Sequence, residues 1–405
     1  MYFIGSKIYI SYFKLFIFII IISFTHQQHA YERGVCIVPC ADLIAEPVHN
    51  VKQYANIPIS VKKFDPICPR IYQLLFNETV EIIEYKNNEV LISLPHVFYQ
   101  REHEIAKNTK YWTVRTNIIS MNELGTKGVD NSLFPSPISF SKPHSTHKNT
   151  VSLTQPFHDS SSGTTFSAGT RFTMASQPSK KNVAVYVYDN KHRAHTIKNI
   201  PTNKCIVQKN IHKEQCKQQF VNLLNTWAHP SSGFIPYVLG GSSFSSTCHN
   251  SFGQQPNNNN IIYSRNEAPT FPYTGLDCAS LIVRAAQIVG IPFYYKNSIT
   301  IARNLKPMSK SDAIEAGDII WIPGHVMIVS SIDKGLLIEA RSYEHGYGKV
   351  HEIPLHKEFK NIHNYHDLLD AYFNHKPLQR LDSQGTLRQT ITDLKILKLE
   401  SVWNT

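Results

Sequence analysis

The spacing of hydrophobic and polar positions changes several times along the chain, and each spacing predicts a different kind of element. In the first part, the short apolar runs "TVEIIEY" (79–85) and "EVLISL" (89–94) flank the polar "KNN", which is typical of a β-hairpin. Apolar and polar positions also alternate in "KNVAVYVYDN" (181–190), which again indicates a strand. Strands this short favour small all-β barrels.

A helical spacing replaces this alternation in the second half of the chain. Apolar residues recur every three or four positions in "KEQCKQQFVNLLNTWA" (213–228), and they cover nearly every face of "CASLIVRAAQIV" (278–289). Asp277 is suited to cap the second helix, and Gly290 with Pro292 ends it. Because the strand candidates "DIIWI", "HVMIVSSI", "GLLIEA" and "KVHEIPL" follow, we expect a buried helix packed on an antiparallel sheet in an α+β arrangement.

The 405 residues exceed one average domain, and polar, turn-rich stretches divide them. The predicted segments are a leader (1–30), a first β domain (31–125), a linker (126–150), a second β domain (151–210), an α+β domain (211–375) and a tail (376–405). The tail has only a weak helical pattern. A polar insertion from 242 to 273 interrupts the α+β domain.

The N-terminus has the layout of a secretory signal peptide. Lys7 and Lys14 precede an apolar run over 15–22, and polar residues lead to the small Ala30. The run is shorter than the roughly 20 residues that span a membrane, so membrane contact is expected only through an uncleaved signal anchor. We therefore expect an exported protein, in the periplasm or in the extracellular space and cell wall.

Export allows the seven cysteines to form disulfides, and their odd number leaves at least one thiol. The connectivity is open, with Cys248 a candidate partner of Cys216 or Cys205. The formal net charge of +11 favours anionic partners, but no Lys/Arg block indicates nucleic acid, and an ordinary basic surface explains the charge equally well.

Three residues suggest nucleophilic catalysis. Cys278 stands in the first turn of the buried helix, where the partial positive charge of the helix N-terminus stabilises a thiolate and lowers the thiol pKa. His325 begins a strand after a Pro-Gly turn and is a candidate base. Glu339, on the next strand, would orient its imidazole if the two strands are antiparallel neighbours. A lone cysteine is more often a buried small side chain, but the order Cys-helix, His-strand, acid-strand favours the catalytic hypothesis.

The motifs "IPYVLGGSS", "GLDCASLIVRAAQIVGIP", "AGDIIWIPGHVMIV" and "GLLIEA" resemble, in this order, those of the NlpC-type murein peptidases, which are papain-like cysteine peptidases of bacterial cell-wall turnover. The resemblance covers roughly residues 212–375 and implies a papain-like catalytic domain. Upstream, "CIVPCADLIAEP" resembles the start of a bacterial SH3-like domain. Two such barrels before the peptidase would resemble the γ-D-glutamyl-L-diamino-acid endopeptidases.

The resemblance implies a role for individual residues. Cys278 would be the nucleophile, His325 the general base and then acid, and Glu339 the third member of the triad. Tyr237 would assist the oxyanion hole together with the backbone N–H of Cys278. Asp277 would hold the free amino terminus of the substrate.

The chain also departs from the family pattern. Glu339 stands where the family commonly has His, and a carboxylate can stabilise the imidazolium in the same way. Ala279 and Ser280 replace the family's Ser-Gly, so the substrate contact expected at Ser280 is altered. Glu78 is a candidate substrate contact if the first barrel forms one wall of the active site.

The implied function is an exported cysteine endopeptidase that hydrolyses an amide bond in peptidoglycan-derived peptides, with γ-D-glutamyl-L-diamino acid as the preferred bond. The alternatives are a catalytically silent cell-wall-binding protein and an amidase or acyltransferase on the same fold. The expected partners are peptidoglycan or muropeptides and no nucleic acid, and a monomer is expected. No cofactor or metal is expected, since the clustered His363, His366 and His375 are more typical of a surface helix.

Overall fold

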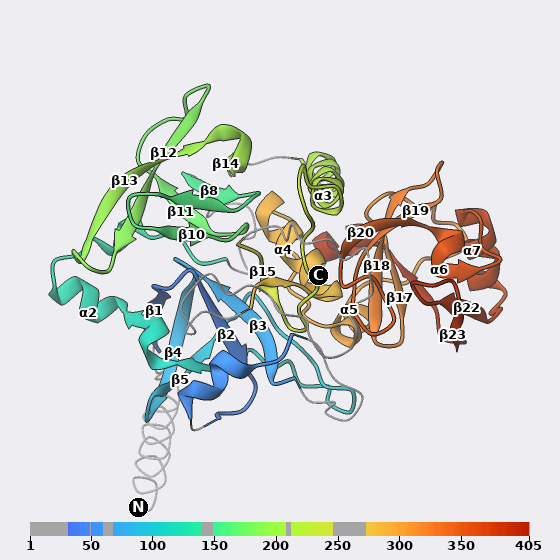
Figure 1. Cartoon of the computed structure of the whole chain (residues 1–405), viewed down its shortest axis with the longest axis horizontal. Helices are drawn as coiled ribbons and strands as arrows, with labels where there is room; N and C mark the ends of the chain where they lie inside the picture. Colours follow the sequence, from blue (N-terminus) through green and yellow to red (C-terminus); the bar gives the residue numbers. More distant parts are fainter. Residues whose placement is uncertain are drawn as a thin grey trace, which may run out of the picture. The chain divides into compact units, whose positions relative to one another are not determined.

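The computed structural model describes residues 31–48, 50–59, 68–138, 149–207, 212–245 and 273–404 (Figure 1). The chain divides into two compact units, Met1–Glu32 and Arg33–Thr405. The predicted signal peptide lies outside the described residues, so the following description concerns the second unit. Within the described ranges, no helix has the length and apolar character needed to cross a membrane.

Among the described residues, seven strands form an N-terminal sheet in the order β3-β2-β6-β5-β4-β1-β7. They are β1 (Glu32–Cys36), β2 (Cys40–Ile44), β3 (Arg70–Leu75), β4 (Thr79–Lys86), β5 (Glu89–Ser93), β6 (Lys110–Val114) and β7 (Ile118–Ser120), accompanied by η1 (Val51–Asn56), η2 (Arg115–Asn117), α2 (Met121–Thr126) and η3 (Asn131–Leu133). The predicted hairpin is confirmed, because β4 pairs antiparallel with β5 and Lys86 lies opposite Glu89. Asn87 makes the turn with a φ of 54°, a left-handed conformation that Asn tolerates.

A second sheet has the order β13-β12-β11-β8-β14. Its strands are β8 (Thr150–Leu153), β11 (Arg171–Met174), β12 (Asn182–Asp189), β13 (Ala194–Pro201) and β14 (Cys205–Val207), and the hairpin β9 (Phe157–Asp159) and β10 (Thr164–Phe166) lies between β8 and β11 in the chain. The predicted strand at 181–190 is confirmed as β12, with Val183 and Val185 completely buried. Phe76 of the first β region and Phe166 and Phe172 of the second belong to one hydrophobic cluster, so the two regions share a core. Their classification as SH3-like barrels stays a prediction.

The rest of the unit contains helices and a sheet of order β20-β19-β18-β17-β24, which we call the C-terminal sheet. The strands, all paired antiparallel, are β17 (Ile319–Ile322), β18 (His325–Ser331), β19 (Leu336–Arg341), β20 (Lys349–Pro354) and β24 (Lys395–Leu397). The two predicted helices are present as α3 (Lys213–Ala228) and α4 (Cys278–Val289). Leu281 and Ile282 of α4 share a hydrophobic cluster with Val326 and Ile338 of the sheet, so this helix is buried as predicted.

The sequence assigned no element to the segment after Lys376, where it showed only a weak helical pattern. The segment contains β22 (Leu378–Leu381), β23 (Leu387–Ile391), β24 and η5 (Leu399–Asn404), and β22 also pairs with β21 (Phe359–Lys360). β24 extends the C-terminal sheet along β17, with Leu397 opposite Ile319. The strand pattern is hidden in the sequence because Arg380, although charged, points into the protein with Leu378. The other short elements are α5 (Ser298–Asn304), α6 (Leu355–Glu358), α7 (Tyr365–Phe373), β15 (Ser242–Ser243) and β16 (Gly275–Leu276), and most of the predicted insertion lies outside the described residues.

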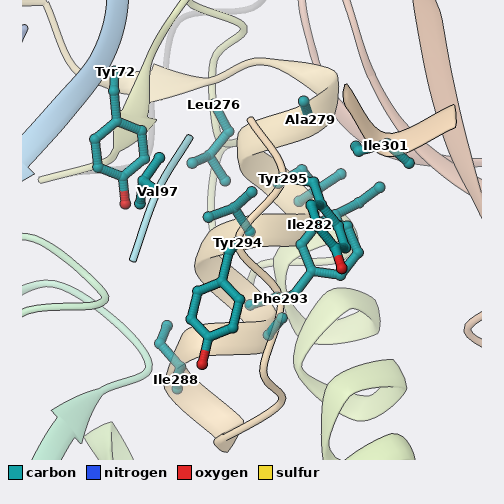
Figure 2. Close-up of a cluster of buried hydrophobic side chains, with 14 of the residues drawn as sticks. Tyr72, Val97, Leu276, Ala279, Ile282, Ile288, Phe293, Tyr294, Tyr295 and Ile301 are labelled. Atoms are coloured by element: carbon teal, nitrogen blue, oxygen red, sulfur yellow. The ribbon is translucent and has the colours of Figure 1, made fainter. Parts of the chain in front are cut away.

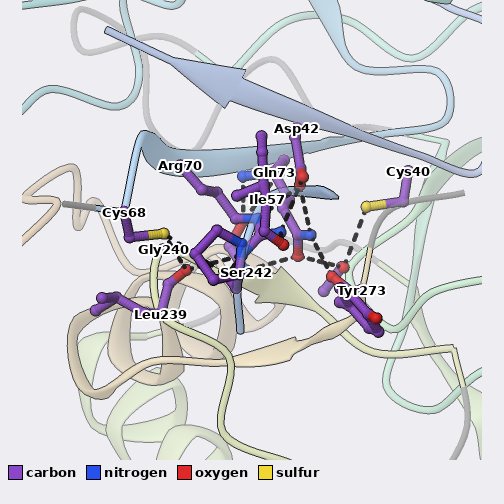
Figure 3. A network of polar contacts seen from close by, with 12 residues as sticks. Cys40, Asp42, Ile57, Cys68, Arg70, Gln73, Leu239, Gly240, Ser242 and Tyr273 are labelled. Carbon is purple, nitrogen blue, oxygen red and sulfur yellow. Dashed lines mark hydrogen bonds and ion pairs between the residues drawn. The ribbon is translucent and has the colours of Figure 1, made fainter. Parts of the chain in front are cut away.

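The N-terminal sheet contacts the helix that begins at Cys278. Figure 2 shows Tyr72 and Val97 in the same apolar cluster as Ile282 and Ile288 of α4 and the aromatic residues that follow it. Polar contacts add to this packing (Figure 3). Arg70 donates to both carboxylate oxygens of Asp42, at 2.8 and 3.0 Å, and to the carbonyl of Leu239 at 3.0 Å. The N-terminal sheet is thus joined to the segment that leads into α4.

Candidate active site

Cys278 is the first residue of α4, and its position is fixed by the helix cap. Asp277 Oδ1 accepts a hydrogen bond of 2.6 Å from the backbone N–H of Ser280, which is the predicted N-cap contact. The backbone N–H groups of Val326 and Ala279 act on the Cys278 thiol and favour its ionised form. Val326 is the second residue of β18, so the thiol meets this strand beside His325.

The pKa of the Cys278 thiol is shifted in the direction opposite to the prediction. Burial of the thiol, assisted by the neighbouring Asp277 carboxylate, raises its pKa to about 12, whereas the N–H of Val326 and the Lys296 ammonium act to lower it. The helix N-terminus therefore does not outweigh the loss of hydration around the thiol. Cys278 is protonated at neutral pH.

His325 begins β18 after a tight turn in which Gly324 has a φ of 78°, a conformation that favours glycine. Its Nε2 lies 2.7 Å from Glu339 Oε2 on the adjacent antiparallel strand β19, so the predicted contact between the two residues is present. Since Glu339 binds Nε2, Nδ1 is the ring nitrogen left to act on the thiol. Burial and the Arg380 guanidinium lower the pKa of His325 to about 4, although Glu339 opposes them, so the imidazole is neutral at pH 7.

Glu339 is completely buried and lies between two imidazoles. Its Oε1 is 3.2 Å from Nε2 of His351, which lies directly opposite it on β20. Contacts with His325 and His351 hold the pKa of Glu339 well below its usual value in spite of burial. His351 was not singled out from the sequence. The only signal for it was its position in the strand pattern of "KVHEIPL".

A second buried carboxylate lies behind Glu339. Glu358 accepts hydrogen bonds of 2.6 Å from Arg341 and from Arg380, and Arg380 also lies 3.5 Å from Glu339 Oε2. Two carboxylates therefore face two guanidinium groups. Burial and the nearby Glu339 raise the pKa of Glu358 to about 7. Sequence reasoning missed this group because its members come from β19, α6 and the segment taken as a tail.

The structure brings Tyr237 to Cys278. A parallel bridge pairs Tyr237 with Leu276, two residues before the nucleophile, and the phenol lies within electrostatic reach of Cys278 and of the Asp277 carboxylate. Burial is the first cause of the strongly raised pKa of Tyr237, which keeps the phenol protonated and able to donate a hydrogen bond. The oxyanion role that the resemblance implies for Tyr237 stays a prediction.

Two other predicted contacts are not available to a substrate in this structure. Ser280 is completely buried, and its Oγ has no hydrogen-bond partner among the described residues, so only its backbone takes part in the site. Glu78 is also buried, and its carboxylate accepts a hydrogen bond of 2.7 Å from Arg284 of α4. The expectation that Glu78 contacts the substrate is therefore wrong. Its place is in an ion pair with the nucleophile helix.

Asp277 uses its second carboxylate oxygen within the protein. Oδ2 accepts a hydrogen bond of 3.0 Å from the N–H of Gly240 and lies 2.5 Å from the Lys296 ammonium. A substrate amino terminus, which the resemblance assigns to Asp277, would have to share this oxygen with Lys296. No sequence pattern indicated Lys296, which stands in the aromatic-rich stretch "PFYYKN".

The cysteines of the described residues form no disulfides. Cys36, Cys40, Cys68, Cys205, Cys216 and Cys278 are all free thiols. Cys248 lies outside the described residues, and so does the pairing suggested for it. In the part of the chain that the structure describes, no three His, Cys, Asp or Glu side chains are grouped to hold a metal ion.

Neither a family model nor a curated protein matches the chain. Solved structures do match it. An NlpC/P60 family protein from Bacillus cereus ATCC 10987 is 14% identical, with a TM-score of 0.51 over 83% of this chain and 96% of that chain. NlpC1 from Trichomonas vaginalis is 13% identical, with a TM-score of 0.31 over 81% of this chain and 89% of that chain.

The fold is a mixed arrangement of antiparallel sheets and helices, with a cysteine at the start of a buried helix and a His–Glu pair on the adjoining strands. This chain has the NlpC/P60 type of fold, as the similarity to the Bacillus cereus protein shows over nearly the full length of that chain.

Proposed function

We propose that the protein is an exported cysteine peptidase that hydrolyses an amide bond in peptidoglycan-derived peptides, with the γ-D-glutamyl-L-diamino acid bond as its preferred target. The observation that carries the proposal is the meeting of three groups. The N–H of Val326 acts on the Cys278 thiol, the preceding His325 begins the same strand, and Glu339 contacts the imidazole of His325 at 2.7 Å. The NlpC/P60 type of fold supports the substrate class.

The proposed reaction begins from a neutral thiol and a neutral imidazole. His325 Nδ1 takes the thiol proton as Sγ attacks the carbonyl carbon of the scissile amide, and Glu339 stabilises the imidazolium that forms. The tetrahedral oxyanion accepts hydrogen bonds from the Cys278 N–H and the Tyr237 phenol. His325 then protonates the leaving amine, which leaves a thioester on Cys278. A water molecule, deprotonated by His325, hydrolyses the thioester and restores the thiol.

Proton transfer during attack fits the ionisation of the two groups better than a preformed ion pair. The pKa of Cys278 is raised to about 12 and that of His325 is lowered to about 4, so neither group is charged at neutral pH. The buried Glu339 carries the compensating charge before the reaction starts, and no solvent reorganisation is required when the imidazolium appears.

The proposal includes export and wall binding. The signal-like leader and the formal net charge of +11 suit a protein that acts on an anionic wall polymer outside the cytoplasm. The two N-terminal β regions would hold the wall polymer if they are SH3-like domains. Their shared core and the Arg284–Glu78 pair support their acting together with the nucleophile helix.

The test uses the purified full chain and the defined muropeptides L-Ala-γ-D-Glu-diaminopimelate and its D-Ala-extended tetrapeptide, with products identified by mass spectrometry. The proposal expects L-Ala-D-Glu together with the released diamino acid or its D-Ala dipeptide, and none of these from the Cys278→Ala variant. Identical products from both proteins would overturn it. Binding to insoluble murein without product would favour a silent binding protein, and a different cleaved or transferred bond would favour an amidase or acyltransferase.

A further inference from the structure

A lysine ammonium is buried beside the nucleophile, where the proposed reaction gives it no role. The Lys296 side chain is 3% exposed, and its Nζ lies 2.5 Å from Asp277 Oδ2. Burying an ammonium is costly unless it is paired, so the position of this residue depends on the carboxylate that caps α4. The pair is therefore part of the site where the thiol is held.

The backbone around Lys296 is fixed from the N-terminal region. The Lys296 N–H donates to the carbonyl of Phe98 at 2.9 Å, and Tyr295 forms a parallel bridge with Phe98. Asn297 has a φ of 80° and donates from its side chain to the carbonyl of Gln100 at 3.0 Å. The ammonium is thus supplied by a segment that the first β region holds in place, and it is not a mobile surface charge.

Asp277 poses an electrostatic problem for the residue that follows it. Its carboxylate caps α4 through Oδ1, but the same negative charge opposes ionisation of the adjacent Cys278. The Lys296 ammonium acts on the thiol in the opposite sense. With Lys296 in place, Asp277 keeps its capping function while its charge is balanced.

We propose that Lys296 is a positioning residue for the reaction of Cys278: its ammonium neutralises Asp277, so the thiol loses its proton beside a balanced ion pair and not beside a lone carboxylate. The proposal rests on Cys278 being the nucleophile, but not on which amide the enzyme cleaves. It also assigns a task to the first β region, which holds Lys296 at the site.

The experiment measures how fast iodoacetamide alkylates Cys278 between pH 7 and pH 9.5, with the modified peptide quantified by mass spectrometry so that the other cysteines do not interfere. Alkylation displaces iodide by the thiolate, so its rate follows the ionised fraction of the thiol and needs no substrate. The alkylation rate does not depend on whether the protein cleaves muropeptides. The test of Lys296 can therefore succeed or fail independently of the test of the proposed peptidase function.

Four variants are expected to change the alkylation rate in different directions, and a general loss of packing would not produce this combination. Lys296→Met should slow alkylation about tenfold or more at a given pH, because Asp277 is left unbalanced, and Asp277→Asn should accelerate it. The Asp277→Asn/Lys296→Met double variant should return close to the wild-type rate, and Lys296→Arg should retain it. The matched control is Lys398→Met, which breaks another buried Lys–Asp pair, at 2.7 Å from Asp318, and should leave the rate unchanged.

Equal rates in wild type and a folded Lys296→Met variant, with folding checked by circular dichroism, would overturn the proposal. If Lys296→Met does not fold, the comparison of Asp277→Asn with the double variant decides, because neither contains an unpaired carboxylate. Asp277→Asn must then be the faster of the two by about tenfold, and equal rates would show that the ammonium has no influence on the thiol.

Discussion

At the scale of single residues, the site is governed by groups that burial keeps neutral. His325 is held against Glu339, and burial together with Arg380 lowers its pKa to about 4. His96 is completely enclosed in the first β region, and neither ring nitrogen has a hydrogen-bond partner among the described residues. Burial lowers the pKa of His96 to about 4 as well. Both imidazoles are therefore neutral in the folded protein at a pH where an unfolded chain would begin to protonate them.

This difference predicts a loss of stability on acidification. The unfolded histidine has a pKa of about 6.5, so the stability contributed by a neutral buried histidine is complete above that pH and declines as the pH falls toward 4. Each of the two residues should account for up to about 3 kcal/mol of the unfolding free energy over this range. Urea unfolding between pH 4.5 and pH 7.5 measures how the unfolding free energy depends on pH. Glu358, with its pKa raised to about 7, contributes in the opposite direction and stabilises the folded protein as the pH falls.

Substitution of single histidines separates their contribution from that of Glu358. His96→Leu and His325→Asn should each flatten the dependence of the unfolding free energy on pH, whereas the exposed His366→Gln should leave it as in wild type. An unchanged slope in His96→Leu would show that His96 is not a neutral buried group.

At the scale of elements, the sequence predicted α4 well and the C-terminal segment poorly, for a physical reason. Helix α4 carries its own signals, with Asp277 as its cap, a continuous apolar surface and Gly290 in the left-handed conformation at its end. The strands after Lys376 are stabilised by distant partners instead. Arg380 can be buried because it pairs with Glu358, and the sequence around either residue does not indicate this pair. The same holds for His351, whose partner Glu339 lies on another strand.

The dependence of β22 on a remote carboxylate predicts the cost of breaking that contact. Arg380→Met removes one of the two guanidinium groups that hold Glu358 and should lower the unfolding free energy by about 3–5 kcal/mol, because a buried carboxylate loses its partner. Chemical denaturation measures the loss. Arg388→Met, on the exposed part of β23, is the matched control and should change stability by less than about 0.5 kcal/mol. A cost in Arg380→Met no larger than in the control would show that Glu358 does not need Arg380.

At the scale of the whole described unit, the N-terminal β regions are structural partners of the nucleophile helix. The sequence divides them from the α+β domain by polar stretches, and that division conceals how closely they pack. Arg284, in the middle of α4, is completely buried and donates to Glu78, to the carbonyl of Gln73 and to the carbonyl of Ser242. Sequence patterns mark Arg284 only as a polar interruption of an apolar helix, because two of its partners lie about two hundred positions earlier and the third is a backbone carbonyl of Ser242.

This contact predicts that a change in the first β region impairs catalysis by Cys278. Glu78→Ala leaves the Arg284 guanidinium buried without its carboxylate, which should lower the unfolding free energy by about 3–5 kcal/mol. Since Arg284 belongs to the nucleophile helix, the rate of muropeptide cleavage or of Cys278 alkylation should fall in the same variant. Glu84→Ala, an exposed site on β4, is the control and should affect neither measurement. The Glu78→Gln/Arg284→Met double variant should recover part of the stability, because it removes both charges together. The prediction fails if Glu78→Ala destabilises only the β region, seen as a separate unfolding transition, while Cys278 keeps its reactivity. The β region and the catalytic region would then be energetically independent.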